Sequence, residues 1–369
     1  MENLEASDLI GIISSSISLL LAFFIFSVES TNKFSNKIFA AYLTLSAFEF
    51  TSWSLFIDIT SNILIFKSQL SHLLMPVFYL YILSVCYSDF KLKWKHLWHM
   101  LPYIAGNLVM LPRFYLSNSS EKLALYENYN EHFEIIYQHF SLHIQFVIYL
   151  IIGFIVLKRA KKIFVENYSS GTIATYNWLF QLLLFIGVLY SLALIKNLFK
   201  YFGDSDYFQI SEIILSGVTL YFVCWYVLKI LKYPNLFKGV NSKIELIKNL
   251  DQQQNQGENQ EEINQLSTFM VAHKPYLNPS LSIRNLAEEI QMNPRDLSVL
   301  INQNLNQHFF DFVNEYRIEE AKEMLKNPAK KEFTVLEILY EVGFNSKSSF
   351  NTAFKKHTGL TPTQFRKTA

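Results

Sequence analysis

Long apolar runs dominate the first 230 residues of this chain, and a more polar, amphipathic pattern follows them. Each run supplies about 20 helical residues, the length that crosses a bilayer core of roughly 30 Å. The first run follows an acidic segment and lacks a small-residue cleavage site, so we expect a retained anchor and not a signal peptide. The pattern predicts seven spans, near residues 8–28, 38–59, 63–87, 97–116, 134–157, 176–199 and 208–231.

Composition favours the same interpretation. Hydrophobic residues make up 51% of the chain and charged residues only 17%, whereas soluble proteins usually contain about 25% charged residues. The net charge of +1 points to no particular partner. Cys86 and Cys224 lie in apolar stretches, so we expect packing residues and no disulfide framework.

The distribution of Lys and Arg beside the predicted spans gives an orientation. Five basic residues lie on one side, at Lys67, Arg113, Lys122, Lys196 and Lys200. Twelve lie on the other, at Lys33, Lys37, Lys91, Lys93, Lys95, Lys158, Arg159, Lys161, Lys162, Lys229, Lys232 and Lys238. We therefore expect a multi-pass protein of the cytoplasmic (inner) membrane, with its N-terminus outside and its C-terminal domain in the cytoplasm.

Polar residues inside spans are costly and often functional. Glu49 is the hardest to explain otherwise, because it lies deep in the aromatic-rich stretch FEFTSWS. His139 and His143 share a helical face, but no third ligand completes a metal site, and we expect neither metal nor cofactor. The candidate residues for an unknown small-molecule or membrane signal are Glu49, His72, Asn107 and His143.

A polar linker is predicted between residues 233 and 265, where the run DQQQNQGENQEE cannot bury enough apolar surface to fold alone. Two apolar sets with near-helical spacing flank this run. Short helices carrying them could pair between two copies of the chain, giving a homodimer, or pack lightly on their neighbours. These sets are Ile244, Ile247 and Leu250, and Ile263, Leu266 and Met270.

Residues 280–306 have the pattern of a helix-turn-helix unit. A short helix opens at Ser282, a turn follows at Gln291 and Met292, and Asn293 and Pro294 suit the cap and first position of a second helix. Second helices of this kind contact base edges and phosphates. The residues expected to face outward and touch DNA are Arg295, Asp296, Ser298, Val299 and Asn302.

A second unit repeats this pattern in residues 333–359. Thr334 and Glu337 form a capping box, Gly343 suits the turn, and Asn345 is expected to cap the next helix. Phe350 and Phe354 form its buried pair. The predicted DNA-binding face carries Lys347, Ser348, Ser349, Asn351, Thr352, Lys355 and Lys356.

An amphipathic stretch from about Phe309 to Lys326 joins the two units, with its apolar side formed by Phe312, Val313, Tyr316, Ala321 and Leu325. A helix of this length spans about 27 Å. It could hold two recognition helices in successive major grooves, which lie about 34 Å apart. Residues 338–369 hold five basic residues against one acidic residue, so the second unit is the expected electrostatic anchor on double-stranded DNA.

Residues 265–369 resemble the DNA-binding domain of the AraC/XylS family of bacterial transcription regulators. The string KPYLNPSLSIRNLAEEI is further similar to membrane-anchored members of the Bacteroidetes, where the domain is cytoplasmic and the preceding spans are presumed sensory. Leu339, Val299, Asn302 and Thr352 depart from the family pattern. The resemblance is carried by Arg317, Ile318, Ala321, Leu325, Ile338, Gly343, Phe344, Ser348, Phe350, Phe354, Lys355, Gly359, Thr361, Pro362 and Phe365.

We thus expect an all-α protein in three parts: a seven-helix transmembrane sensor (1–232), the linker (233–265) and a DNA-binding domain with two helix-turn-helix units (266–369). This organisation predicts a membrane-embedded, one-component transcription regulator and not an enzyme, since no phosphate-cradling loop, nucleophile elbow or metal set is evident. The alternative is a membrane receptor whose C-terminal helical domain binds a protein partner instead of DNA.

Overall fold

The computed structural model describes residues 5–27, 33–127, 131–169, 173–203, 205–232, 256–330 and 332–368. Regular structure within these ranges is helical, apart from an isolated antiparallel bridge between Tyr168 and Ser282. The chain divides into two compact units. The first contains Met1–Leu157 and Leu179–Phe237, and the second contains Lys158–Trp178 and Lys238–Ala369.

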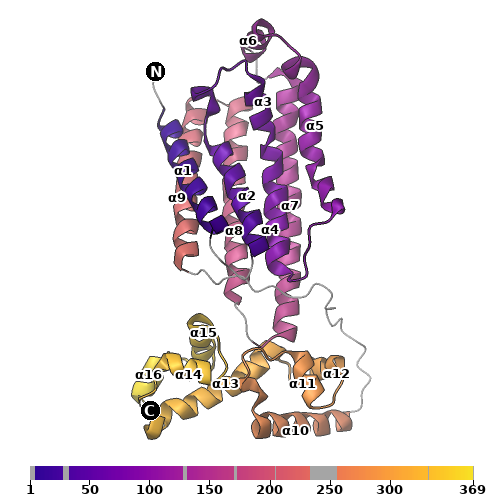
Figure 1. The fold of residues 1–369 in the computed structure, drawn as a ribbon, viewed down its shortest axis with the longest axis vertical. Coiled ribbons are helices and arrows are strands. Elements are labelled where there is room, and N and C mark those ends of the chain that lie inside the picture. Colours follow the sequence, from indigo (N-terminus) through magenta and orange to yellow (C-terminus); the bar gives the residue numbers. More distant parts are fainter. Residues whose placement is uncertain are drawn as a thin grey trace. The chain divides into compact units, whose positions relative to one another are not determined.

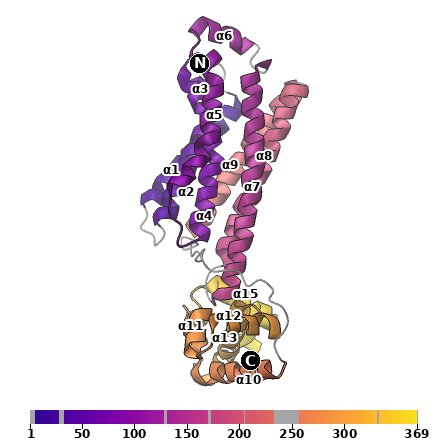
Figure 2. The same cartoon turned by 90° about the vertical axis from the view of Figure 1, so that its right-hand side faces the viewer.

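The first unit is a bundle of long helices, as Figures 1 and 2 show from two sides. Helix α6 lies near the start of α3, where Lys122 donates to the carbonyl of Thr60 at 3.0 Å. The helices are α1 (Ala6–Ser27), α2 (Lys33–Phe50), α3 (Asn62–Gln69), α4 (Ser71–Cys86), α5 (Leu101–Met110), α6 (Ser119–Glu127), α7 (Phe133–Asn167), α8 (Ile173–Phe202) and α9 (Ser205–Lys232).

Small residues allow α1 to pack closely on α2 and α9. A Cβ atom at Gly11 would lie 2.3 Å from the carbonyl oxygen of Phe50, so only glycine fits this crossing. The Ser15 hydroxyl donates to the carbonyl of Ala47 at 2.8 Å, and Ser18 and Tyr226 share a hydrogen bond of 2.8 Å. These bonds satisfy polar groups in an otherwise apolar bundle, where an unpaired group would be costly.

Five segments of the described chain are long and apolar enough to cross a membrane: Ala6–Ser27, Asn62–Cys86, Phe133–Asn167, Tyr176–Phe202 and Asp206–Ile230. Five of the seven predicted spans correspond to these segments. The other two, near 38–59 and 97–116, are not among these five segments. Helix α2 ends at Phe50 and a 3-10 turn follows at Trp53–Leu55, while α5 ends at Met110 and continues as a π turn, Leu111–Tyr115, that contains Pro112.

The second unit contains α10 (Gln256–His273), α11 (Ile283–Glu289), α12 (Pro294–Val299), α13 (Phe309–Lys326), α14 (Val335–Glu341), α15 (Lys347–Thr358) and α16 (Pro362–Thr368). Its interior has two apolar clusters, and α13 contributes to both. Phe312 and Val313 belong to the first cluster, with residues of α10, α11 and α12, whereas Ala321 and Leu325 belong to the second, with residues of α14 and α15.

The predicted linker divides at the edge of the described region. Residues 233–255, which include Ile244, Ile247 and Leu250, lie outside it, and residues 256–265 begin α10. Leu266 and Met270 are buried in the first cluster, and Ile263 packs against that cluster. This second apolar set therefore packs within its own chain, whereas pairing between two copies stays a prediction for the first set.

Candidate nucleic-acid interface

The first helix-turn-helix unit begins as its sequence predicts. The Ser282 side chain accepts a hydrogen bond from the amide of Asn285 at 3.3 Å, which closes a capping box at the start of α11. Asn293 caps α12 by accepting from the amide of Arg295 at 2.9 Å, and Pro294 occupies the first position of that helix. Between them Gln291 adopts a φ of 55°, the left-handed conformation that turns the chain.

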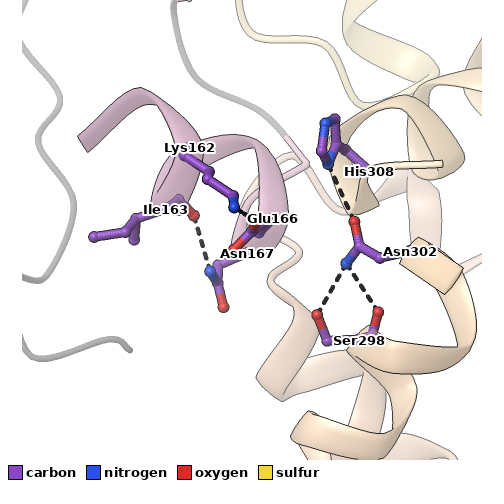
Figure 3. A network of polar contacts seen from close by, with 7 residues as sticks. All are labelled: Lys162, Ile163, Glu166, Asn167, Ser298, Asn302 and His308. Atoms are coloured by element: carbon purple, nitrogen blue, oxygen red, sulfur yellow. Dashed lines mark hydrogen bonds and ion pairs between the residues drawn. The ribbon is translucent and has the colours of Figure 1, made fainter. Parts of the chain in front are cut away.

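The outward face of α12 is smaller than predicted. Arg295 and Asp296 are exposed, and Val299 and Asn302 are partly exposed. Ser298 is buried, so the expectation that it faces outward was wrong. The amide of Asn302 folds back and donates to the Ser298 carbonyl at 2.8 Å and to its hydroxyl at 3.2 Å, which also turns Asn302 inward (Figure 3).

The geometry that turns Asn302 inward comes from the residues that follow α12. A wider π turn, Leu300–Asn304, extends the helix and alters the register of its faces. His308 then contacts the Asn302 side-chain oxygen at 3.1 Å. Both polar ends of Asn302 are thus engaged inside the domain, and a DNA base would have to compete with these bonds.

The second helix-turn-helix unit has the predicted buried apolar residues, but one of its helix caps differs from the prediction. Thr334 and Glu337 form their capping box, with bonds of 2.6 and 3.1 Å between side chain and amide. Phe350 and Phe354 are fully buried, with ring centroids 5.6 Å apart. The N-cap of α15 is Ser346, whose hydroxyl accepts from the amide of Ser349 at 3.2 Å, so the assignment of the cap to Asn345 was wrong.

The outward face of α15 is polar and positively charged. Lys347, Ser348, Thr352, Lys355 and Lys356 are exposed. Asn351 and Ser349 are partly exposed, and the Ser349 hydroxyl accepts a bond from Ser346 at 2.8 Å. Lys356 is already paired with Asp311 of α13 at 2.6 Å, although its side chain remains 60% exposed. Lys347 and Lys355 are therefore better candidates than Lys356 for contacts with phosphate groups.

Arg317 has a structural role that its sequence signature did not reveal. Its side chain is fully buried on α13 and donates to the carbonyls of Tyr276 at 2.6 Å and Asn278 at 2.8 Å. Burial lowers the pKa of the guanidinium to about 10, which leaves it charged at neutral pH. The available signal was one arginine in an apolar stripe, because Arg317 lies four residues after Val313 and four before Ala321.

The first unit contains a separate cavity of about 450 Å³, which brings together two of the four signal-binding candidates. Glu49 and His143 line it, and these side chains contact Ser71 at 2.6 Å and Asn197 at 3.0 Å respectively. His72 and Asn107 do not line this cavity. His72 is buried and contacts Ser141 at 3.0 Å, while Asn107 accepts from the Tyr115 hydroxyl at 2.7 Å.

Comparison with known proteins agrees with the geometry of the two helix-turn-helix units. Residues 286–368 match a family model described as a helix-turn-helix domain. This chain carries a helix-turn-helix domain. The relatives described next are named as regulatory proteins, and each match covers less than a third of this chain.

Three relatives illustrate the likeness. An uncharacterized transcriptional regulatory protein of Bacillus subtilis (strain 168), YesN, is 37% identical over 92 residues, which are 24% of this chain and 24% of that protein. An uncharacterized helix-turn-helix regulator from Pseudoalteromonas carrageenovora is 50% identical over 56 residues, 15% of this chain and 31% of its own. The Msm operon regulatory protein of Streptococcus mutans is 26% identical over 97 residues, 26% of this chain and 34% of its own.

Two solved structures are similar to part of this chain. The C-terminal domain of AraT, a response regulator from Geobacillus stearothermophilus, is 30% identical and covers 29% of this chain and 84% of its own, with a TM-score of 0.25. A protein of unknown function from Listeria innocua is 27% identical and covers 29% of this chain and 95% of its own, also with a TM-score of 0.25. The matched region of this chain thus spans at most about a third of the three relatives named above.

Proposed function

We propose that this protein is a membrane-embedded, one-component transcription regulator, in which a signal received by the helical bundle changes DNA binding by the C-terminal domain. One observation carries the proposal: a single chain combines five segments able to cross a membrane with a helix-turn-helix domain related to transcriptional regulators. This arrangement needs no catalytic step, because binding energy alone transmits the signal.

The orientation part of the proposal rests on charge. Twelve basic residues lie on one side of the seven predicted spans and five on the other, which favours an outside N-terminus and a cytoplasmic C-terminus. A cytoplasmic domain has access to the chromosome without release from the membrane.

The cavity in the helical bundle is a candidate site for binding the signal. Its volume of about 450 Å³ lies within the range of small-molecule sites, roughly 300–1,000 Å³. Glu49 and His143 supply an acidic and an imidazole group among apolar walls that include Leu74 and Phe222. We propose this cavity as the site for a small-molecule or membrane-derived signal, with Glu49 and His143 as its polar contacts.

Two copies of the chain acting together would bind DNA more strongly than one. A second domain held on the same membrane has a raised effective concentration at a neighbouring site, and its binding then requires no new contact. A homodimer on repeated half-sites is therefore part of the proposal. Such sites recur at one helical turn of DNA or multiples of it.

The decisive experiment is selection of genomic fragments by the full chain in detergent. We expect enrichment of a motif with two elements about one helical turn apart. The double variant Lys347→Ala/Lys355→Ala should lose most of this enrichment, and its affinity should depend less steeply on salt, because each lost phosphate contact lowers the slope of log K against log salt by about 0.9.

Lys322→Ala is the matched control. Lys322 lies on α13 and pairs with Glu319 at 2.7 Å, so its removal also deletes a positive charge but not from the predicted DNA-binding face. Equal losses in the control and the double variant would contradict a specific role for α15. Absence of any enrichment by the unaltered chain at moderate salt would overturn DNA binding and favour a domain that binds a protein partner.

A further inference from the structure

The end of α7 belongs to the same compact unit as the DNA-binding domain. Residues Lys158–Trp178 fall in this second unit, although they lie more than 75 residues before α10 in the sequence. Ser169 is buried, and both its amide (3.2 Å) and its hydroxyl (2.6 Å) donate to the carbonyl of Leu281. Tyr168 forms an antiparallel bridge with Ser282. The segment therefore pairs with the backbone directly before α11.

Arg317 of α13 also binds this segment. Its guanidinium donates to the Ser169 carbonyl at 2.9 Å and to the Ser169 hydroxyl at 3.1 Å, in addition to its bonds to Tyr276 and Asn278. A buried cation is costly unless its donors are satisfied. Ser169 accepts the hydrogen bonds that the guanidinium would give to water if it were exposed. The contact is thus specific, because it matches two guanidinium nitrogens to two oxygens of one residue.

Aromatic packing extends the contact to the start of α13. Phe164 is buried, and its ring centroid lies 6.0 Å from that of Phe310. Between Phe164 and Ser169, the side chain of Glu166 is only 5% exposed and pairs with Lys162 at 3.8 Å. Figure 3 shows this last turn of α7, with Glu166 beside Lys162 and the Asn167 side chain bonded back to the Ile163 carbonyl. We call residues 164–169 the docking segment.

We propose that the docking segment and DNA compete for the first helix-turn-helix unit, so that the docked arrangement withholds this unit from DNA. The inference rests on the proposed function. It assigns the surface formed by Leu281, Ser282, Phe310 and Arg317 to a partner within the same chain, the segment that follows the predicted membrane span 134–157.

One observation sets the direction of the effect. The first helix of a helix-turn-helix unit crosses the DNA backbone, and the docking segment pairs with the chain at Ser282, where that helix begins. DNA and the docking segment therefore need the same surface.

A disulfide across the Tyr168–Ser282 bridge tests the inference in the full chain. Paired residues of an antiparallel bridge have Cα atoms about 4.5–5.5 Å apart, which suits a disulfide. The variant Tyr168→Cys/Ser282→Cys is made with Cys86→Ala and Cys224→Ala to remove the native thiols. The control pair, Tyr168→Cys/Thr363→Cys, places the second thiol on exposed α16.

We expect the first pair to cross-link in native membranes under mild oxidation and the control pair not to. The DNA probe is a duplex that carries the motif enriched by the unaltered chain. Oxidised protein should bind it at least about tenfold more weakly than the same protein reduced with dithiothreitol, because a locked segment removes the binding-competent population. The arginine variant Arg317→Lys, which keeps the charge but loses the fork of donors, should lower the cross-linking yield.

The outcomes separate the two proposals. Failure of the first pair to cross-link, or equal DNA affinity in its oxidised and reduced forms, would overturn the docking inference and leave the regulator intact. Absence of DNA binding by the reduced and the unaltered protein would instead overturn the proposed function. A cross-link that strengthens DNA binding would reverse the assigned direction and so contradict the inference.

Discussion

Glu320 shows how one carboxylate helps to join the start of the DNA-binding domain to its central helix. Lys274 pairs with it at 2.8 Å, and the Tyr276 hydroxyl donates to it at 3.1 Å. Burial raises the pKa of Glu320, but these two hydrogen bonds and the positive charges of Lys274 and Lys330 together outweigh that effect and hold the pKa below its ordinary value of 4.5. The ionised form therefore stabilises the folded domain.

This shift predicts a pH dependence of stability. A lowered pKa in the folded state contributes stability that is present above about pH 4.5 and is lost as the pH falls through the folded-state value. Glu320→Gln should lower the free energy of unfolding at pH 7 by about 1 kcal/mol, and the difference from the unaltered protein should shrink below pH 4.5.

Urea unfolding of residues 256–369 at several pH values measures this difference. Glu319→Gln is the control, because Glu319 pairs with Lys322 but its side chain is 60% exposed, and exposed pairs contribute little. A Glu320→Gln deficit that stays constant from pH 7 to acid conditions would show that the substitution acts through packing and not through charge.

At the scale of elements, the turn between α14 and α15 is the most constrained part of the second helix-turn-helix unit. Gly343 has a φ of 87°, a conformation that residues with a Cβ atom rarely adopt. A Cβ atom there would lie 2.6 Å from the carbonyl oxygen of Tyr276 and 2.7 Å from that of Leu277. The turn is therefore packed directly on the backbone that precedes the first helix-turn-helix unit. This contact helps fix the two helix-turn-helix units relative to each other.

Gly343→Ala should destabilise the domain by more than about 2 kcal/mol, since it combines backbone strain with a clash against rigid carbonyls. Gly359→Ala isolates the strain term. Gly359 ends α15 with a φ of 74°, but no atom lies within 4 Å of the position of its Cβ, so we expect a loss of only about 1 kcal/mol. Thermal unfolding compares the two variants, and equal losses would contradict the role of the clash.

Caps and buried faces explain what could be predicted from the sequence at this scale. Ser282, Asn293 and Thr334 each cap a helix as predicted, because side-chain oxygens at these positions meet amides that have no other partner. Asn345 and Ser346 are both good caps and adjacent, so local chemistry could not choose between them. Ser298 was misplaced because the π turn after α12 and the folded-back Asn302 are tertiary features with no local signal.

The docking segment lay beyond sequence reasoning for a related physical reason. Ser169 and Leu281 are 112 residues apart, and their pairing depends on how two distant stretches of the chain come together within the second compact unit. Hydrophobic periodicity identifies a helix and its buried face but not a backbone contact at such a separation. Only the isolated charge of Arg317 within an apolar stripe pointed to a buried polar partner.

At the scale of the whole molecule, the number of membrane crossings decides the side on which Lys91, Lys93 and Lys95 lie. With seven spans this basic loop is cytoplasmic. With only the five long apolar helices, neither α2 nor α5 crosses, and the same loop would be outside with residues 117–131. Both arrangements have an odd number of spans and place the termini on opposite sides, so the location of this loop separates them.

We expect the loop inside, because positive residues beside spans favour the cytoplasmic side and a crossing helix within a bundle can be less apolar where it packs on its neighbours. Lys91→Cys, in a chain with Cys86→Ala and Cys224→Ala, should therefore resist a membrane-impermeant maleimide in intact cells and react after permeabilisation. Ser120→Cys should react in both conditions, because residues 117–131 are outside in either arrangement. Labelling of Lys91→Cys in intact cells would establish that α2 and α5 do not cross, and would leave the charge bias satisfied only by the remaining loops.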